Sequence, residues 1–339
     1  MRPLAPVVLA AAIVLVSGCR QIAGIEDIQL TGDAGITSDA GTLPKSETLV
    51  SVVGEAVNGL IVSSGYVYAR TATSVWRCPI LGCQAPEILV PSSAATILDI
   101  EVFGTELYFA STESGGVIRA VGLDGKNGRI YTAAPDVAKL ATDGKVMFWA
   151  SAPSAGGGDV QRCAAPTCAT STSMITIDFV DFDPEAVELH VFGTDVVAVG
   201  ESGTTDVRAV KCGVGATCGS TPTTVIADAS ELTLFPTPSR LLFASYDDIG
   251  FYDGAGKRTI LANGATGTSP WAAGDDAFVF ANLAEGATTA EHAIRVATTG
   301  GAASTVAQVA ESIDAGAVDG GYLYYAYKTT SVVLARVKP

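Results

Sequence analysis

The sequence has few histidines, little charge and no helical periodicity. It contains 2 histidines among 339 residues, and 16% of its residues are charged. His190 and His292 lie far apart in the chain, and neither H-E-x-x-H nor G-x-S-x-G occurs. No long stripe of apolar residues at helical spacing survives the frequent glycine, threonine and proline. These absences argue against a helical fold and against the hydrolase classes that those motifs mark, so a non-catalytic role is favoured over an enzyme.

Basic residues are also scarce. The chain has 20 lysines and arginines against 35 aspartates and glutamates, a formal charge of −15 at pH 7. Nucleic-acid binding draws its affinity from lysine and arginine contacts to phosphate, so this composition argues against it. A polybasic contact with anionic lipid is disfavoured for the same reason. An acidic surface of this kind mainly favours solubility.

Long hydrophobic runs are missing except for a short one near the N-terminus. Arg2 precedes the apolar residues 7–16, and Val16-Ser17-Gly18-Cys19 follow. Ten apolar residues are too few to span a bilayer, which needs about 20. Residues 1–18 are therefore predicted to be a cleaved signal peptide.

The cysteine at the end of this segment resembles the lipobox of bacterial lipoproteins. That resemblance implies cleavage before Cys19 and lipidation of its side chain. Arg20 occupies the place where an aspartate retains such proteins in the inner membrane, which favours the outer membrane of a bacterial cell envelope. An ordinary secretory signal with an incidental cysteine is the alternative. The lipid is then the expected membrane contact.

The segment after the lipobox is small, polar and aperiodic. Residues 19–46 include Gly32-Asp33-Ala34-Gly35 and hold little that could build a core. A flexible chain of this length has a root-mean-square reach of roughly 30 Å. We therefore predict a lipidated cysteine and tether at 19–46 and one folded domain at 47–339.

A short apolar strand signature recurs throughout that domain. Its seven copies occupy residues 65–69, 106–110, 146–150, 195–199, 241–244, 277–281 and 322–326. Strand repeats of about 40–50 residues are typical of β-propeller blades. The sequence therefore predicts a seven-bladed β-propeller, with six or eight blades as the alternatives.

Each repeat divides into four short strands. The expected blades span 57–90, 97–132, 137–177, 186–226, 231–261, 270–308 and 314–337. The last has room for only three strands, whereas residues 47–53 form a strand without a blade of its own. We predict that this strand completes the last blade and closes the ring, which removes two exposed sheet edges.

Six cysteines of the domain form three close pairs at the same place in their repeats. They are Cys78 with Cys83, Cys163 with Cys168, and Cys212 with Cys218. Each pair flanks a turn between two predicted strands, so disulfides across hairpins are expected in an exported protein. Zinc binding is the alternative, but it prefers closer spacing and four ligands together.

The lipobox, the seven signatures and the three cysteine hairpins together resemble bacterial β-propeller lipoproteins whose blades contain paired cysteines. The resemblance covers about 290 residues. It implies the fold and the location. It says little about activity, because propellers host many unrelated functions.

Two features are candidate sites. Asp178, Asp181, Asp183 and Glu185 place four carboxylates within eight residues and are predicted as Ca²⁺ ligands, with a solvated acidic loop as the alternative. His190 lies on an apolar inner strand and is a candidate for lining the central channel. No other cofactor is expected.

Acidic residues are also expected to gather in the loops of one face. These are Glu113, Asp136, Asp159, Glu201, Asp206, Asp228, Asp247, Asp248, Glu285 and Glu291. We expect a monomer that binds or scaffolds a protein or glycan partner in the envelope. The alternative is a propeller lyase, lactonase or hydrolase that uses carboxylates and a divalent cation at the channel mouth, with His190, Asp178, Asp181 and Asp183 as its candidate residues.

Overall fold

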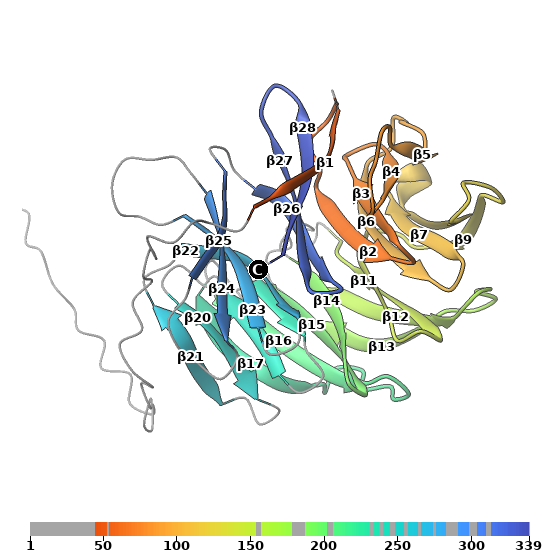
Figure 1. Cartoon of the computed structure of the whole chain (residues 1–339). Helices are drawn as coiled ribbons and strands as arrows, with labels where there is room; N and C mark the ends of the chain where they lie inside the picture. The colour runs from red at the N-terminus through yellow and green to blue at the C-terminus, as the bar shows by residue number, and fades with distance from the viewer. Residues whose placement is uncertain are drawn as a thin grey trace, which may run out of the picture.

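The computed structural model is built almost entirely of β-strands (Figure 1). It describes residues 45–52, 54–153, 157–177, 187–201, 206–230, 233–236, 240–244, 248–253, 257–263, 266–273, 276–282, 291–297, 304–309 and 313–338. These residues contain 28 strands and one short 3₁₀ helix, Glu113–Gly115. Within the described ranges, no helix is long and apolar enough to cross a membrane.

The strands form seven four-stranded antiparallel sheets, and the first three lie in the N-terminal half. One contains β2 (Gly59–Ser63), β3 (Tyr66–Arg70), β4 (Val75–Pro79) and β5 (Glu87–Val90). The next contains β6 (Ile97–Phe103), β7 (Glu106–Ser111), β8 (Val117–Gly122) and β9 (Arg129–Ala133). The third contains β10 (Val137–Thr142), β11 (Val146–Ser151), β12 (Gly158–Ala164) and β13 (Thr172–Ile177).

Three further sheets have the same strand order. They contain β14 (Glu188–Phe192), β15 (Asp195–Glu201), β16 (Asp206–Gly213) and β17 (Thr223–Ser230); then β18 (Thr233–Pro236), β19 (Arg240–Ala244), β20 (Asp248–Asp253) and β21 (Arg258–Asn263). The next contains β22 (Thr266–Ala273), β23 (Asp276–Asn282), β24 (Glu291–Ala297) and β25 (Ser304–Val309).

The remaining sheet joins the two ends of the domain. It contains β26 (Ile313–Asp319), β27 (Tyr322–Lys328) and β28 (Val332–Val337), with β1 (Glu47–Val52) as its fourth strand. β1 lies beside β28 (Figure 1) and pairs antiparallel with it, with Glu47 opposite Arg336. The predicted closure by the N-terminal strand is therefore observed. It covers the open edge of β28, which would otherwise expose unpaired backbone groups.

The sheets follow one another around a centre in chain order (Figure 1). The first strand of each sheet contacts the first strand of the next, and β26 contacts β2 to complete the circle. This arrangement confirms the predicted all-β propeller.

The core lies between adjacent sheets, which explains why the signature strands are apolar on both faces. In β3, Val67 and Ala69 pack toward β27 and β28, whereas Tyr68 packs toward β6 and β7. In β11, Met147 and Trp149 face the preceding sheet, and Phe148 faces the following one. A strand buried on both faces loses the usual alternation of apolar and polar residues.

Two expected boundaries were wrong. The strand expected to begin at residue 270 begins at Thr266. The register shifts between Thr268 and Trp271. Pro270 lies at this shift, where the irregular pairing tolerates a residue that has no amide hydrogen to donate. The strand expected to end at residue 226 continues to Ser230 across further register shifts.

Candidate functional site: the central channel and the rim contacts

The three predicted disulfides are present in the outer hairpins of three sheets. They join Cys78 to Cys83, Cys163 to Cys168 and Cys212 to Cys218, with Cα–Cα distances of 5.4, 5.5 and 6.1 Å. The first cysteine of each pair is buried against the preceding sheet. The disulfides therefore shape the hairpins at the place where one sheet meets the next.

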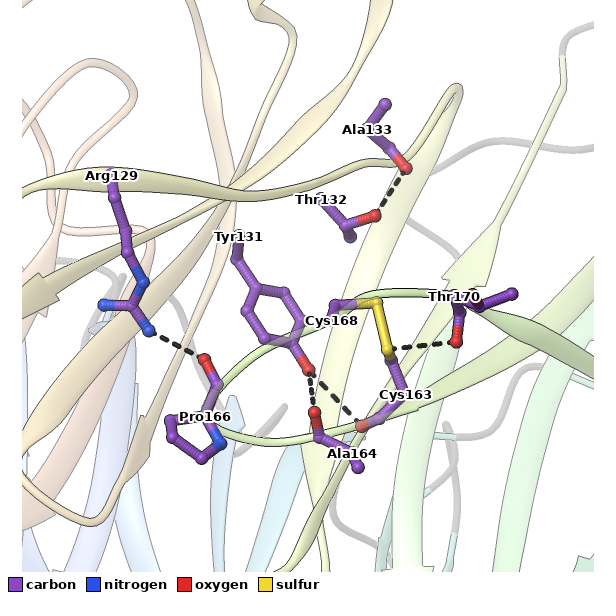
Figure 2. The surroundings of a disulfide bond; sticks show 9 residues. All are labelled: Arg129, Tyr131, Thr132, Ala133, Cys163, Ala164, Pro166, Cys168 and Thr170. Carbon is purple, nitrogen blue, oxygen red and sulfur yellow. Dashed lines mark hydrogen bonds between the residues drawn. A yellow bond between two sulfur atoms is a disulfide. The ribbon is translucent and has the colours of Figure 1, made fainter.

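One of these hairpins shows how the sheets are joined. Arg129 of β9 reaches the hairpin of the next sheet, where its Nη2 donates to the backbone oxygen of Pro166 at 2.8 Å (Figure 2). The hydroxyl of Tyr131 donates to the backbone oxygens of Cys163 and Ala164 at 3.3 and 3.2 Å. Burial raises the pKa of Tyr131 to about 12. Its hydroxyl therefore stays a donor at neutral pH.

The same kind of contact recurs at three other hairpins. Arg336 Nη1 donates to the backbone oxygen of Ile80 at 2.6 Å, and Arg162 Nη1 donates to that of Val214 at 2.5 Å. Arg77 donates in the same way to Leu123. In each case an arginine of one sheet reaches the outer hairpin of the next. We call the contacts of Arg77, Arg129, Arg162 and Arg336 the rim contacts.

Three of the four arginines occupy one equivalent position. Arg77, Arg162 and Arg336 lie on the third strand of their sheets, opposite Tyr68, Phe148 and Tyr324 of the signature strands. In the second sheet Ala120 occupies this position, opposite Tyr108. Arg129 pairs with Ala120 from the neighbouring strand. The guanidinium of Arg129 therefore contacts the next hairpin in place of an arginine at position 120.

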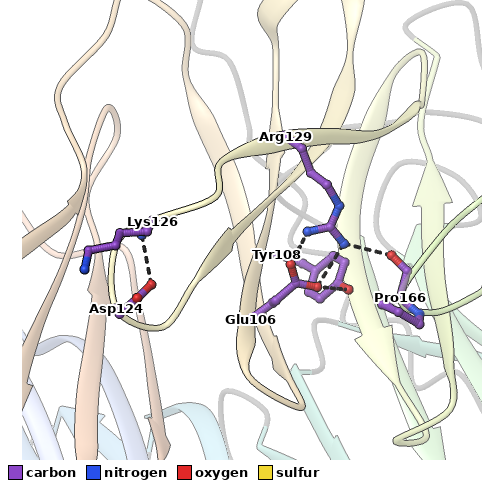
Figure 3. A network of polar contacts seen from close by, with 6 residues as sticks. All are labelled: Glu106, Tyr108, Asp124, Lys126, Arg129 and Pro166. Atoms are coloured by element: carbon purple, nitrogen blue, oxygen red, sulfur yellow. Dashed lines mark hydrogen bonds and ion pairs between the residues drawn. The ribbon is translucent and has the colours of Figure 1, made fainter.

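Carboxylates neutralise most of these arginines. Arg129 pairs with Glu106, and its Nη2 lies 2.9 Å from Glu106 Oε2 (Figure 3). Arg129 holds the pKa of Glu106 below its usual range. Arg77 and Arg336 form ion pairs of 2.6 and 2.8 Å with Glu87 and Glu47. Three of the four rim contacts, those of Arg77, Arg129 and Arg336, are therefore charge-compensated, which strengthens their hydrogen bonds.

The hairpin that Arg77 reaches has no disulfide. Its turn is held instead by Asp124 Oδ1, which accepts from the backbone nitrogen of Lys126 at 3.0 Å (Figure 3). Gly125 adopts a φ of 76°, a left-handed conformation that favours glycine. Side-chain capping and a glycine thus do for this hairpin what a disulfide does for the other three.

A polar cavity of about 350 Å³ lies between the inner strands β2, β6, β10 and β14. Its ionisable lining residues are Asp99, Glu101, Lys139, Glu188 and His190. Because these strands are consecutive around the ring, the cavity is part of the central channel. His190, the residue expected to face the channel, is one of the residues that line this cavity. Its Nε2 lies 3.4 Å from Glu188 Oε2.

Two neighbouring carboxyl groups of β6 have different surroundings. Asp99 Oδ2 accepts from the backbone nitrogen of Leu140 at 2.8 Å, which joins β6 to β10. Glu101 has no side-chain partner among the described residues, and its hydrogen bond is with the backbone of Val102. Burial, with the negative charge of Asp99 adding to it, raises the pKa of Glu101 to about 8. Glu101 is therefore mostly protonated at neutral pH.

The other predicted sites lie outside the described residues. Asp178, Asp181, Asp183, Glu185 and Cys19 belong to this group. In the ranges that the structure describes, no group of three or more histidines, cysteines or carboxylates is arranged to hold a metal. Calcium binding and lipidation therefore stay predictions.

Two of the predicted acidic loop residues are paired. Glu113 lies 2.7 Å from Arg119, and Asp248 lies 2.7 Å from Arg258. At these two positions the expected acidic face is neutralised by neighbouring arginines.

No family model and no curated protein matches the chain. Solved structures do match it. A chain of a crystal structure of the mitotic checkpoint complex is similar with a TM-score of 0.64 and 13% identity, over 93% of this chain and 100% of that one. YCF48 bound to D1 peptide is similar with a TM-score of 0.63 and 10% identity, over 91% and 99%. The computationally designed Ika8 protein has a TM-score of 0.54 and 13% identity, over 85% and 98%.

These likenesses show a shared fold. Identities of 10% to 13% show nothing about ligand or activity.

Proposed function

We propose that this protein is a lipid-anchored binding module of the bacterial cell envelope, in which all seven sheets act as blades of one rigid propeller. Cys19 would be the lipidated residue, and residues 20–46 would hold the propeller clear of the membrane. Its partner would be a protein or a glycan of the envelope. Ring closure through β1 joins the tether directly to the rigid domain.

The polar cavity at the centre of the closed ring is the observation on which the binding role rests. Its ionisable residues come from three different inner strands, β6, β10 and β14. A rigid scaffold that presents such groups with fixed spacing loses little entropy when a partner binds. YCF48 has a similar fold and is bound to the D1 peptide in its structure, so a propeller of this shape is compatible with peptide binding.

The anchor is tested by fractionation of a bacterium that expresses the full chain. We expect the wild type in the membrane fraction and Cys19→Ser in the soluble fraction. A Cys19→Ser protein that remains with the membrane would contradict the lipid anchor.

The binding role is tested by cross-linking and affinity capture from envelope extracts. The wild type and Cys19→Ser serve as baits, and the tag alone is the control. We expect both baits to enrich the same partner above the tag alone. Equal recovery by the tag alone would contradict a binding role, and it would leave the anchor test unaffected.

A further inference from the structure

The channel contains two ionisable side chains that lack side-chain partners among the described residues. They are Glu101 of β6 and Lys139 of β10, and both line the same cavity. Among the described residues neither forms an ion pair, whereas Arg77, Arg129 and Arg336 at the rim are each neutralised by a carboxylate. Buried or half-buried ionisable groups without partners are costly, so a structure that retains them suggests a function.

The cavity is large enough for a small molecule. Its volume of about 350 Å³ falls at the lower end of the range of ligand sites. Aliphatic side chains contribute to its wall, including Ile61, Ile100, Leu189 and Val191. The lining thus combines an apolar surface with a few polar groups, as binding sites for small organic molecules do.

Its ionisable groups are predominantly acidic. Asp99 and Glu101 come from β6, Glu188 and His190 from β14, and Lys139 from β10, whereas β2 contributes the apolar Ile61. Asp99 is engaged by Leu140, and Glu188 lies beside His190. Glu101 is therefore the carboxyl group best placed to accept a hydrogen bond from a ligand.

From this geometry we propose that the channel binds a small alkyl molecule with a primary ammonium group, with Glu101 as the principal acceptor. The alkyl part would lie against Ile61 and Ile100, and the ammonium would donate to the Glu101 carboxylate. The positive charge of Lys139 would repel the ammonium group of the ligand and so limit its affinity. This proposal assigns a small ligand to the cavity on which the proposed binding role also rests, and its test with a purified small molecule does not require the envelope partner.

Binding of a cation at this position is linked to proton release. In the free protein Glu101 holds its proton up to a pKa of about 8, because burial disfavours its charged form. An ammonium ion stabilises the carboxylate and displaces that proton to solvent. Affinity should therefore rise as the pH increases toward 8 and level off above it.

The test is calorimetric titration of the full chain with n-butylammonium, at pH 6 and pH 8. Butyrate and n-butanol serve as the anionic and neutral probes. We expect n-butylammonium to bind best and to bind about tenfold or more tightly at pH 8 than at pH 6. Absence of n-butylammonium binding in the wild type, or tighter binding of butyrate, would overturn the proposal.

Three variants identify the residues involved. Glu101→Gln should weaken n-butylammonium binding at least tenfold at pH 8 and abolish its pH dependence. Lys139→Met should tighten binding several-fold, because it removes a like charge. Glu113→Gln removes a carboxylate of the Arg119 pair outside this cavity and should leave binding unchanged. Unchanged affinity in Glu101→Gln, with its fold verified by circular dichroism, would refute the site.

Discussion

The rim and the channel of this propeller use ionisable groups in opposite ways. At the rim, Arg129 pairs with Glu106 and donates to the hairpin of the next sheet. In the channel, Glu101 and Lys139 line one cavity without side-chain partners among the described residues. The rim groups thus join sheets together, whereas the channel groups are left free to meet a ligand.

This difference separates stability from binding within one fold. Loss of a rim contact removes a charge-assisted hydrogen bond between two sheets and should lower stability. Loss of Glu101 removes a partly buried ionisable group and should raise stability near neutral pH. Substitutions in the two regions should therefore have effects of opposite sign.

The largest expected effect comes from removal of the closing strand. Deletion of residues 45–52 exposes the edge of β28, breaks the Glu47–Arg336 pair and removes the buried Leu49 and Val50. We expect a loss of several kcal/mol or a failure to fold, because these two side chains alone contribute roughly 1.5–3 kcal/mol each. Deletion of residues 33–40, an equal length of the tether, is the matched control. Equal melting temperatures for the two deletions would show that β1 does not close the ring.

Next in size is the pH dependence that Glu101 imposes on stability. Its carboxyl pKa is raised on folding to about 8, so the folded state holds a proton that the unfolded state has already lost. Stability should therefore fall by about 1.4 kcal/mol per pH unit between the ordinary glutamate pKa and about 8. Glu101→Gln should remove this slope and melt above the wild type by a margin that grows up to pH 8. Parallel curves for the two proteins in urea denaturation at several pH values would contradict the burial of this carboxyl.

Removal of one disulfide should have a smaller effect. Replacement of Cys163 and Cys168 by alanine frees the hairpin that presents Pro166 to Arg129. In the chain-entropy model a loop of this size contributes about 2 kcal/mol. We expect that loss in chemical denaturation, with n-butylammonium binding unchanged because the channel lies elsewhere. Weakened binding in this variant would show that the rim and channel are coupled.

The smallest expected effect separates a rim contact from an ordinary surface pair. Arg129→Ala removes hydrogen bonds to Glu106 and Pro166 and should cost about 1 kcal/mol. Arg119→Ala removes an ion pair with Glu113, which lies in the 3₁₀ helix just before the strand of Arg119, and should change stability by about 0.5 kcal/mol or less. Equal losses in urea denaturation would mean that the contact between sheets adds nothing.

Much of the fold followed from local sequence patterns. The apolar signatures are recognisable because β3 or β11 is buried on both faces, which removes the alternation of an ordinary surface strand. The disulfides followed from short spacings across turns. The closing strand followed from a mismatch, since residues 47–53 had no repeat of their own and the last repeat lacked a strand.

The rim contacts, and the placing of Glu101 and Lys139 in one cavity, could not be predicted from local sequence patterns. Arg77 and Arg162 directly precede cysteines, which was a visible signal, but their partners lie in the next sheet. Arg129 makes its contact from a different strand, so the repeat pattern conceals it. Glu101 and Lys139 belong to neighbouring sheets, and only the ring brings them to one cavity. Contacts between repeats depend on the geometry of the closed ring, which no single repeat contains.

The most direct test is a comparison of thermal unfolding for Arg129→Ala and Glu101→Gln, measured together with the wild type at pH 8. If rim groups stabilise the ring and channel groups are retained for binding, Arg129→Ala melts below the wild type and Glu101→Gln melts above it. If both variants melt below the wild type, Glu101 contributes to stability and the division between rim and channel is wrong.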